Sequence, residues 1–475
     1  MDHNFDLIVI GAGPGGYTAA EHAARQGLRV AVIERHKLGG CCINYGCIPT
    51  KAFIHASSLY SSLKNCGQFG LVAGETGFDF PAVCAYKDDA IARFRESVGQ
   101  EFDQLGVVFI QGTAQIVREG VVSVTPAQGG KEVFRARHIL IATGARAYKP
   151  PIPGIDLPGV VTSWEILGTP HWDYDQLVIL GGGVVGVELA SVFNAFGAKV
   201  TIIEQAPRLL GPMDREISES LEKMLRRRGI DIYTEASATA IEQNADGRLC
   251  CRFRMKSGLP GQLEATRILV AAGRRAYLDG LTADGLTLET KDGRIAVDSN
   301  FQTSIPNVFA VGDVMETVQL AHLASAEGVC VVDKLCGNPP SVLLSTVPSC
   351  AFVELPVIPT CIHVNPEIAS VGISEEQAIR HGISVSCGRY DIRTNGKAII
   401  SKESSGFIKL VFESHRKVLI GAQMMCPRAS DMIGEMATAV ANEMTARQLL
   451  SAMRAHPTFN EGIDEAIRDC LAKNR

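Results

Sequence analysis

The alternation of apolar runs and glycine turns near the start of the chain is repeated farther along it. Residues 7–34 read LIVIGAGPGGYTAAEHAARQGLRVAVIE, and residues 177–204 read LVILGGGVVGVELASVFNAFGAKVTIIE. Each copy has a β-branched run, a glycine turn, a helix-length segment, a second β-branched run and a terminal carboxylate, an order that predicts a βαβ unit. Equivalent positions lie 170 residues apart, and they are Gly11, Gly13, Gly16, Gly27, Val30 and Glu34 in the first copy and Gly181, Gly183, Gly186, Gly197, Val200 and Glu204 in the second.

The glycine spacing in each copy is that of a dinucleotide-binding turn. The first glycine permits a sharp turn, the second lets a pyrophosphate approach the backbone, and the third lets helix and strand pack closely. The helix N-terminus then presents free N–H groups and a positive dipole to the phosphates. Glu34 and Glu204 each follow the first glycine by 23 residues, where a carboxylate can accept hydrogen bonds from ribose hydroxyls. Two ligand-free glycine turns would leave these matched carboxylates unexplained, so we expect two dinucleotide sites.

Two dinucleotide sites in one chain are typical of two cofactors that exchange a hydride. Glu204 favours NAD over NADP at the second site, because its carboxylate would repel a 2′-phosphate. Arg208 is the opposing signal, and its long stem is expected to carry the charge to solvent.

The rest of the chain is less periodic. A strand expected at 138–142 is followed by Thr143-Gly144 and a proline-rich stretch. A strand expected at 267–272 is followed by Gly273, and one expected at 307–311 is followed by Gly312-Asp313. Asp313 either completes a turn or faces the first nucleotide site. Residues 341–359 are rich in Pro and Ser and mark a boundary. The segments beyond it predict an α+β region, with strands at 361–364, 407–412 and 418–424 and helices at 429–442 and 446–453.

Composition excludes several classes of protein. The 475 residues are 46% hydrophobic and 20% charged, which is an ordinary globular profile rather than that of a disordered or fibrous chain. The 46 basic and 51 acidic residues form no block of like charge, so a nucleic-acid or anionic-lipid patch is not expected. The longest apolar run, residues 177–187, is too short to span a bilayer and is broken by glycines. The N-terminus is neither a signal nor a transit peptide, so a cytoplasmic location is expected.

Three of the 14 cysteines, Cys41, Cys42 and Cys47, fall within seven residues. In a regular helix Cys42 and Cys47 would be separated by about 7.5 Å of rise, whereas a disulfide prefers Cα atoms about 5.5 Å apart. A bridge between them therefore requires a distorted turn, which Gly46 would ease. Cys47 would then lie near a helix start, where the dipole stabilises a thiolate.

Other interpretations of these thiols remain open at this point. A zinc site would require a second pair of Cys or His residues at the spacing usual for zinc ligands. The sequence has no such pair, so no metal is expected. A structural disulfide is disfavoured in a reducing compartment. Isolated buried thiols are possible, and Cys41 leaves the pairing undetermined by spacing.

A second candidate site is the segment His456-Pro457-Thr458-Phe459-Asn460-Glu461. Proline restricts the backbone of His456 to extended or turn conformations. Glu461 could bond one ring nitrogen, fix the tautomer and raise the basicity of the imidazole, as a base for a thiol substrate requires. From the sequence alone, a capped helix start with Thr458 or Asn460 as the cap is the favoured interpretation.

These segments together carry a resemblance to a known family. Residues 39–51, GGCCINYGCIPTK, resemble the active-site segment of the flavin-dependent pyridine nucleotide–disulfide oxidoreductases, and residues 456–461 resemble their C-terminal His–Glu motif. Three further segments are most similar to the dihydrolipoamide dehydrogenases of that family. They are residues 48–51 (IPTK), residues 319–322 (QLAH) with Glu327-Gly328, and residues 365–372 (NPEIASVG).

The resemblance implies an α/β fold with two Rossmann-like domains, which bind FAD and NAD, and an α+β C-terminal dimerisation domain. The implied boundaries are 1–150 for the FAD domain with the redox disulfide, 151–275 for the NAD domain, 276–345 for a central domain completing the FAD site, and 346–475 for the interface domain. It also implies a homodimer, in which each active site borrows the His–Glu pair of the partner subunit.

The resemblance assigns a role to each matching residue. Cys42 exchanges with the substrate, Cys47 is the thiolate against the flavin, and Lys51 lies near the reactive flavin nitrogen and pairs with Glu188. His456 is the base, and Glu461 orients it. The residues implied at FAD are Gly11, Gly13, Gly16, Glu34, Lys51, Ala114, Thr143, Gly144, Asp313, Gln319, Leu320, Ala321 and His322. Those implied at NAD are Gly181, Gly183, Gly186, Glu188, Glu204, Ala238 and Gly273.

The implied reaction oxidises protein-bound dihydrolipoyl groups and reduces NAD⁺. The implied partner is a lipoyl-bearing acyltransferase subunit or carrier protein of a 2-oxoacid dehydrogenase-type complex. The alternatives are a related flavin reductase with another disulfide substrate, an FAD-binding redox sensor that uses Cys41, and a structural subunit of a multienzyme complex. The sequence departs from the family's usual pattern at Cys41, where Thr is usual, at Tyr45, where a small aliphatic residue is usual, and at Asn460, where Ser or Glu is usual.

Overall fold

The two repeated segments form the centres of two parallel sheets in the computed structural model, which describes residues 3–315, 318–346 and 354–473. In the first copy the elements are β1 (Asn4–Ile10), α1 (Pro14–Arg25) and β2 (Val30–Glu34). In the second they are β9 (Gln176–Leu180), α6 (Val184–Ala195) and β10 (Lys199–Ile203). The helices α1 and α6 coincide at the offset of 170 residues, so the repeat in sequence is also a repeat in structure.

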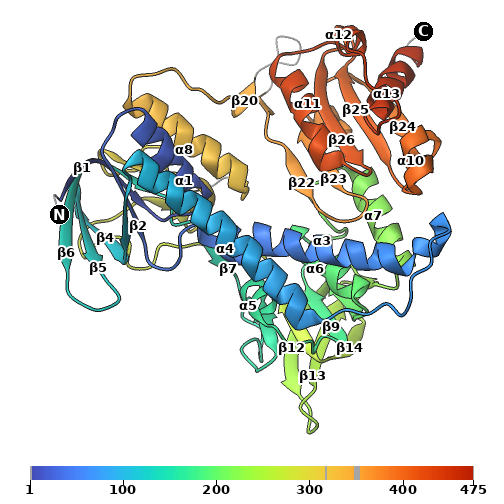
Figure 1. Cartoon of the computed structure of the whole chain (residues 1–475), viewed down its shortest axis with the longest axis horizontal. Coiled ribbons are helices and arrows are strands. Elements are labelled where there is room, and N and C mark those ends of the chain that lie inside the picture. Colours follow the sequence, from blue (N-terminus) through green and yellow to red (C-terminus); the bar gives the residue numbers. More distant parts are fainter. Residues whose placement is uncertain (1–2, 316–317, 347–353, 474–475) are drawn as a thin grey trace.

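The first sheet has seven strands in the order β3-β2-β1-β6-β5-β4, and β19 adds to it by pairing with β6. The strands not yet given are β3 (Val108–Gln111), β4 (Thr113–Arg118), β5 (Val121–Thr125), β6 (Glu132–Ile141) and β19 (Val308–Ala310). Its central strands are buried on both faces, which explains their continuous apolar runs. Helix α8 (Ala321–Leu335) contacts α1 on this sheet, and Figure 1 shows the two side by side.

The second sheet has five parallel strands in the order β11-β10-β9-β15-β8. Its other strands are β8 (Val160–Thr162), β11 (Asp231–Tyr233) and β15 (Arg267–Val270), and its other helices are α5 (Ser163–Gly168) and α7 (Arg215–Arg227). A three-stranded antiparallel sheet follows, made of β12 (Ala236–Gln243), β13 (Leu249–Met255) and β14 (Pro260–Ala265). Two further two-stranded sheets are present. One pairs β7 (Ala145–Ala147) with β16 (Arg274–Ala276), and the other pairs β17 (Thr290–Lys291) with β18 (Arg294–Ile295).

The C-terminal unit is an antiparallel sheet covered by helices. Its strand order is β22-β23-β26-β25-β24, and the strands are β22 (Thr360–Ile362), β23 (Ile368–Gly372), β24 (Val385–Asp391), β25 (Phe407–Glu413) and β26 (Leu419–Met425). Its helices are α9 (Glu375–Arg380), α10 (Gly396–Ser401), α11 (Ala429–Ala441), α12 (Ala446–Ser451) and α13 (Glu461–Ala472), with the 3₁₀ turn η3 (Ile392–Thr394). The strands and helices expected beyond residue 360 are therefore present, with ends shifted by one or two residues. A small pair, β20 (Ser345–Thr346) with β21 (Leu355–Pro356), lies at the junction, and residues 347–353 of the expected boundary lie outside the described residues.

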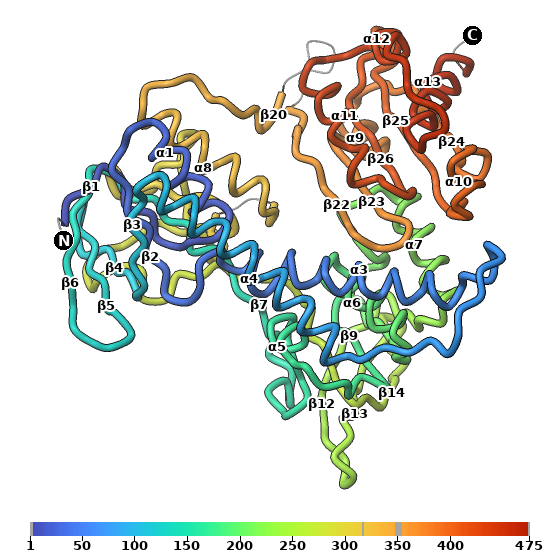
Figure 2. The backbone as a smooth tube through the Cα atoms, viewed as in Figure 1, coloured from blue at the N-terminus to red at the C-terminus, as the bar shows by residue number. Residues whose placement is uncertain are grey.

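Two long helices connect the first unit with the rest of the molecule. They are α3 (Cys47–Lys64) and α4 (Phe80–Leu105), preceded by α2 (Gly40–Tyr45) and separated by the 3₁₀ turn η1 (Cys66–Phe69). Figure 1 shows α3 running beneath the C-terminal unit and α4 running from the first unit toward the second. Figure 2 shows how the chain, after completing the second unit, returns to the first with α8 before it enters the C-terminal unit. The expected α/β class, with two Rossmann-like units and an α+β C-terminal unit, is confirmed.

Candidate active site

The glycine turns of the two units show why glycine is required. Gly11 and Gly181 have φ values of +104° and +116°, a region that favours glycine. A Cβ atom on Gly16 would lie 1.9 Å from the carbonyl oxygen of Gly11, and one on Gly186 would lie 2.0 Å from that of Gly181. The second glycine differs, because a Cβ on Gly183 would meet no protein atom within 4 Å. The space beside it is therefore open to a ligand, as the expected approach of a pyrophosphate requires.

The two matched glutamates hold these turns in the same way. Glu34 accepts hydrogen bonds from the backbone N–H of Ala12 at 2.9 Å and from that of His36 at 2.8 Å. Glu204 accepts from the N–H of Gly182 at 2.5 Å and from that of Ala206 at 2.6 Å. Each carboxylate is thus fixed beside the glycine turn before any ribose binds, with lone pairs to spare for hydroxyl donors. The backbone clamp was not predicted from the sequence.

Arg208 does not carry its charge to solvent, and that expectation was wrong. Its guanidinium donates to the carbonyl oxygens of Gly211 and Met213, at 3.0 and 3.3 Å, and lies 3.5 Å from the carboxylate of Glu376. The two carbonyls and the carboxylate hold the side chain in place. Because these groups already bind the Arg208 guanidinium, it is not available to a 2′-phosphate, and the preference for NAD that Glu204 indicates is retained.

A cavity of about 760 Å³ extends from the first glycine turn to the segment that carries the cysteines. Most residues expected at FAD line it, and they are Gly11, Gly13, Glu34, Lys51, Ala114, Thr143, Gly144, Asp313, Gln319, Leu320, Ala321 and His322. Gly16 is not among them, because it serves the packing of α1 on β1. The volume is in the range of ligand sites, and an open turn lies at one end with a thiol pair at the other. The residues present therefore fit an extended flavin dinucleotide.

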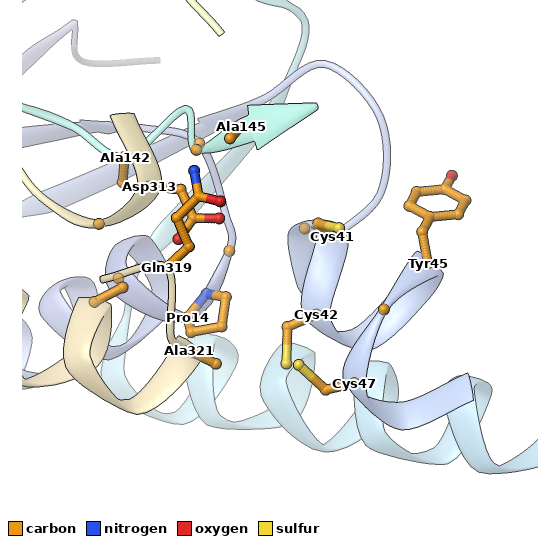
Figure 3. A pocket seen from close by; sticks show the side chains of 18 of the residues that line it. Pro14, Cys41, Cys42, Tyr45, Cys47, Ala142, Ala145, Asp313, Gln319 and Ala321 are labelled. Atoms are coloured by element: carbon orange, nitrogen blue, oxygen red, sulfur yellow. The ribbon is translucent and has the colours of Figure 1, made fainter. Parts of the chain in front are cut away.

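The cysteine pairing that spacing left open is decided by a break between two helices. Helix α2 ends at Tyr45, and Gly46, with φ −138° and ψ −100°, separates it from α3, which begins at Cys47. Figure 3 shows the sulfur atoms of Cys42 and Cys47 facing one another, with Cys41 directed elsewhere. The described cysteines are all free thiols, so this is the dithiol state of the pair.

The two thiols have opposite acidities. The hydrogen bond from Cys42 lowers the pKa of Cys47 to about 7, with a further contribution from the Lys51 ammonium group. The same hydrogen bond, together with burial, raises the pKa of Cys42 well above its usual range. Cys47 is therefore the thiol that ionises first, with its midpoint close to neutral pH, while Cys42 keeps its proton. This division matches the roles that the resemblance implied, of a charge-transfer thiolate and an exchanging thiol.

Lys51 and Glu188 form an ion pair across two units. The Lys51 Nζ atom donates to both Glu188 carboxylate oxygens at 2.9 Å, and the backbone N–H of His363 donates to Oε1 at 2.8 Å. Glu188 is 3% exposed and lies on α6, so the pair joins the redox segment to the second unit. All three residues line the cavity. His363, which sequence reasoning missed, brings the C-terminal unit to the same point.

We expect the Lys51 charge to lower the pH at which the Cys47 thiolate forms, in addition to the effect of the Cys42 hydrogen bond. In the two-electron-reduced holoenzyme, long-wavelength absorbance from the thiolate–flavin contact should rise as the pH increases through about 7. Lys51→Met removes the positive charge and should move this midpoint to higher pH. Spectroscopic titration between pH 5 and 10 measures it. A midpoint that is the same in both proteins would exclude Lys51 as a cause.

Cys41 belongs to a separate cluster. The Arg274 Nη1 atom lies 3.4 Å from the Cys41 sulfur, and Nη2 lies 3.2 Å from Asp313 Oδ2 and 2.6 Å from the carbonyl oxygen of Ala145. Burial raises the pKa of Asp313, against the opposing charge of Arg274. Asp313, on the 3₁₀ turn η2 (Gly312–Val314), thus faces the first site. Arg274 was missed, because no local pattern connects it to residues so distant in the chain.

His456 and Glu461 form the expected pair. The ring Nδ1 atom lies 2.8 Å from Glu461 Oε1, while Oε2 accepts from the N–H of Thr458 at 2.8 Å. The N–H of Thr458, followed by His456, lowers the pKa of Glu461. Asn460 makes no side-chain cap at α13, and the Thr458 hydroxyl donates to the carbonyl oxygen of Ala455, so neither residue caps the helix with its side chain. His456 is 78% exposed and does not line the cavity of its own chain.

The residues expected at NAD fall into two groups. Of these residues Glu188 lines the cavity, together with Val184 and Val185 of α6, which were not predicted. Gly181, Gly183, Gly186 and Glu204 form the second glycine turn, Gly273 follows β15, and Ala238 lies at a register shift in β12. Among the described residues no three His, Cys, Asp or Glu side chains gather as metal ligands. None of the described helices is both long and apolar enough to cross a membrane.

Comparison with known proteins places this site in a family. Residues 5–328 match the model of the pyridine nucleotide-disulphide oxidoreductases, and residues 358–467 match the dimerisation domain of the same group. A dihydrolipoyl dehydrogenase of Chlorobaculum tepidum is 34% identical over 98% of this chain and 97% of its own length. The dihydrolipoyl dehydrogenase of Bacillus subtilis is 32% identical, with 98% of each chain covered.

Solved structures agree with this assignment. The HOCl-induced flavoprotein disulfide reductase RclA from Escherichia coli, also determined as a Cu(II) complex, is 26% identical, with a TM-score of 0.84 over 99% of this chain and 100% of its own. LpdA from Mycobacterium tuberculosis, at 24% identity, shares the fold with a TM-score of 0.87 over 97% of this chain and 99% of its own.

Fold and site together define a flavoprotein disulfide oxidoreductase that uses FAD and NAD. The chain belongs to the pyridine nucleotide-disulphide oxidoreductase family, and its dimerisation domain makes it a homodimer.

Proposed function

We propose that this enzyme oxidises protein-bound dihydrolipoyl groups to the lipoyl disulfide with reduction of NAD⁺. The single observation that carries the proposal is the facing pair Cys42 and Cys47, at the end of a dinucleotide cavity and beside Lys51. Relatives that cover almost the whole chain and are named dihydrolipoyl dehydrogenase support the choice of substrate. The partner that presents the dihydrolipoyl group is then a lipoyl-bearing acyltransferase subunit or carrier protein of a 2-oxoacid dehydrogenase-type complex.

The thiol exchange begins with proton removal. His456 of the partner subunit takes a proton from the dithiol, in the tautomer that Glu461 fixes. The substrate thiolate attacks the sulfur of Cys42, the Cys42–Cys47 bond breaks, and Cys47 leaves as a thiolate. The second substrate thiol then attacks the mixed disulfide, gives its proton to Cys42, which leaves as a thiol, and is released as part of the lipoyl disulfide. In the first exchange the leaving sulfur is that of Cys47, the thiol with the lower pKa, as thiol exchange favours.

The residues of the cavity then hold the reduced pair. The Cys42 thiol donates to the Cys47 thiolate, and Lys51 supplies a positive charge that Glu188 keeps in place. When bound in this cavity, FAD supplies the two-electron chemistry that connects the thiol pair to a nicotinamide. Gly11 and Gly13 would hold its pyrophosphate and Glu34 its adenosine ribose. The two electrons and one proton of the dithiol end in NADH, and the second proton is released.

The test of this function is a comparison of substrates. The purified holoenzyme should form NADH from NAD⁺ with free dihydrolipoamide, and should not use NADPH to reduce glutathione disulfide or mercuric ion at a comparable kcat/KM. A higher kcat/KM with either of the other substrates would identify a different disulfide reductase and contradict the assignment.

Replacing Glu204 by alanine should weaken NAD binding. The variant loses the ribose acceptor and leaves the N–H groups of Gly182 and Ala206 unpaired. Hydrogen bonds to charged groups contribute about 1.5–3 kcal/mol, so the dissociation constant should rise about 10- to 150-fold. Calorimetric titration of the holoenzyme with NAD⁺ measures it. Unchanged affinity, at unchanged flavin content, would contradict the role of Glu204 at the ribose.

We also propose the four-part division at residues 150, 275 and 345, because β19 pairs with β6 and α8 contacts α1, as a segment that completes the first site should. The proposal includes a cytoplasmic location, because the disulfides of cytosolic proteins are usually transient and catalytic, as that of Cys42 and Cys47 would be.

A further inference from the structure

The helix that carries Cys42 has little stability of its own. Helix α2 is six residues long, and it follows Gly39, whose φ of +97° is left-handed, and ends at the break at Gly46. No side chain caps its N-terminus. A helix this short depends on tertiary contacts for its position. The contacts of α2 therefore determine where the Cys42 sulfur lies relative to Cys47 on α3.

One face of α2 is attached to the first unit. Ile43 is completely buried there, and the Asn44 amide donates to the carbonyl oxygens of Leu38 at 3.0 Å and Gly40 at 2.9 Å. The other face carries Tyr45, whose ring stacks on Trp164 with 4.3 Å between centroids and 16° between planes. Figure 3 shows the Tyr45 ring directed away from Cys42 and Cys47. Tyr45 thus extends from the redox segment without obstructing the sulfur pair.

Trp164 belongs to the second unit. It lies on α5, whose start is fixed by a capping box in which the Thr162 N–H donates to Glu165 at 2.7 Å. Helix α5 follows the edge strand β8, which pairs with β15, and β15 pairs with β9, the strand that leads into the glycine turn at Gly181. The indole Nε1 atom is buried without a hydrogen-bond partner, so ring packing, and not a polar contact, sets its position. A displacement of the second unit is therefore passed to Tyr45.

The Tyr45 end of the stack also borders the cavity that extends from the first glycine turn to α6. Tyr45 lines the large cavity together with Ser163 and Leu167 of α5 and with Val184 and Val185 of α6. Val184 and Val185 are each 39% exposed at the first turn of α6, beside the second glycine turn. A nicotinamide that reaches from that turn into the cavity meets these side chains. The redox helix and the second site thus share one wall.

We propose that Tyr45 is a positioning residue, whose stack on Trp164 couples dinucleotide binding on the second unit to the redox state of Cys42 and Cys47. The inference rests on the proposed use of NAD with this disulfide and adds a means of regulating it. Coupling between two sites is reciprocal. If nucleotide binding shifts the equilibrium between the disulfide and dithiol states by a given factor, the nucleotide dissociation constants of the two states must differ by the same factor. The expected factor is about 2- to 12-fold, the equivalent of the about 0.5–1.5 kcal/mol of an aromatic pair.

The experiment uses the flavin-loaded dimer and 1,4,5,6-tetrahydro-NAD, a probe that cannot donate a hydride. Its dissociation constant is measured by calorimetry with the oxidised enzyme and with the enzyme kept reduced by excess dithiothreitol. The two values should differ about 2- to 12-fold in the wild-type protein. Tyr45→Phe keeps the ring and should keep the ratio, whereas Tyr45→Ile removes the stack and should bring the ratio close to one.

A spectroscopic signature separates positioning from a general loss of structure. The chain has two tryptophans, so Trp172→Phe leaves Trp164 as the sole indole. Its emission should change on reduction in that background, and Tyr45→Ile should abolish the change. If Tyr45→Ile loses flavin, Trp164→Leu breaks the stack from the other unit instead, and it should bring the calorimetric ratio of the preceding experiment close to one.

The outcomes are distinct. A wild-type ratio of one, a ratio preserved in Tyr45→Ile, or a ratio lost in Tyr45→Phe would each overturn the coupling through the stack. Failure of the probe to bind either redox state would instead contradict the proposed use of NAD, which fails separately in the substrate comparison.

Discussion

Replacing Cys47 by serine is expected to abolish dihydrolipoamide-dependent NADH formation, with a loss of at least about a thousandfold, as follows when a residue that takes part in covalent catalysis is removed. A serine hydroxyl cannot form the disulfide with Cys42, and it cannot supply the thiolate whose pKa the Cys42 hydrogen bond lowers to about 7. The reduced holoenzyme should also lose its long-wavelength charge-transfer absorbance. Steady-state rates and the visible spectrum measure the two effects independently.

The matched control for this variant is Cys41→Ser. Cys41 is adjacent to Cys42 in sequence, lines the same cavity and contacts Arg274 at 3.4 Å, yet it lies outside the facing pair. Its replacement should leave both the turnover and the charge-transfer band within a few-fold of wild type. A Cys47→Ser enzyme that still turned over, or a Cys41→Ser enzyme that did not, would show that the redox bridge uses different sulfur atoms.

The parts of this site that the sequence predicts are those in which chemistry and position are local. The glycines of the turn at Gly11 are required by a φ value or by a contact within a few residues. The motif can therefore be recognised in the sequence, and it recurs at Gly181. The same holds for His456 and Glu461, which bond within one short segment.

What the sequence left open depends on contacts between distant segments. The choice among Cys41, Cys42 and Cys47 is settled by a helix break at Gly46, a backbone feature that spacing does not determine. Arg274 reaches Cys41 over 233 residues, and no periodicity predicts such a meeting. Arg208 was expected at the solvent because its stem is long, but nearby carbonyl groups and Glu376 hold it.

Replacing His456 by glutamine should lower the rate of disulfide reduction by dihydrolipoamide by about 10²–10⁴-fold, the usual contribution of a general base. Glutamine retains a polar side chain but cannot take the proton of the substrate thiol. Stopped-flow reduction of the flavin by dihydrolipoamide isolates this step. The half-reaction with NADH does not need the base for a lipoyl thiol, so it should remain within a few-fold of wild type. Equal losses in both directions would contradict the assigned role.

The position of His456 leads to a stronger test. In its own chain it is 78% exposed and outside the cavity that holds Cys42 and Cys47, so it can serve that cavity only in the partner subunit of the dimer. Homodimers of Cys47→Ser and of His456→Gln should both be nearly inactive with dihydrolipoamide. A heterodimer of the two variants has one cavity with Cys47 intact, facing the intact histidine contributed by the other subunit. It should therefore recover about half of the wild-type rate per dimer, since one of two sites is complete. If His456 served the cavity of its own chain, every site in the heterodimer would lack one group, and tagged, purified heterodimers would be as inactive as their parents.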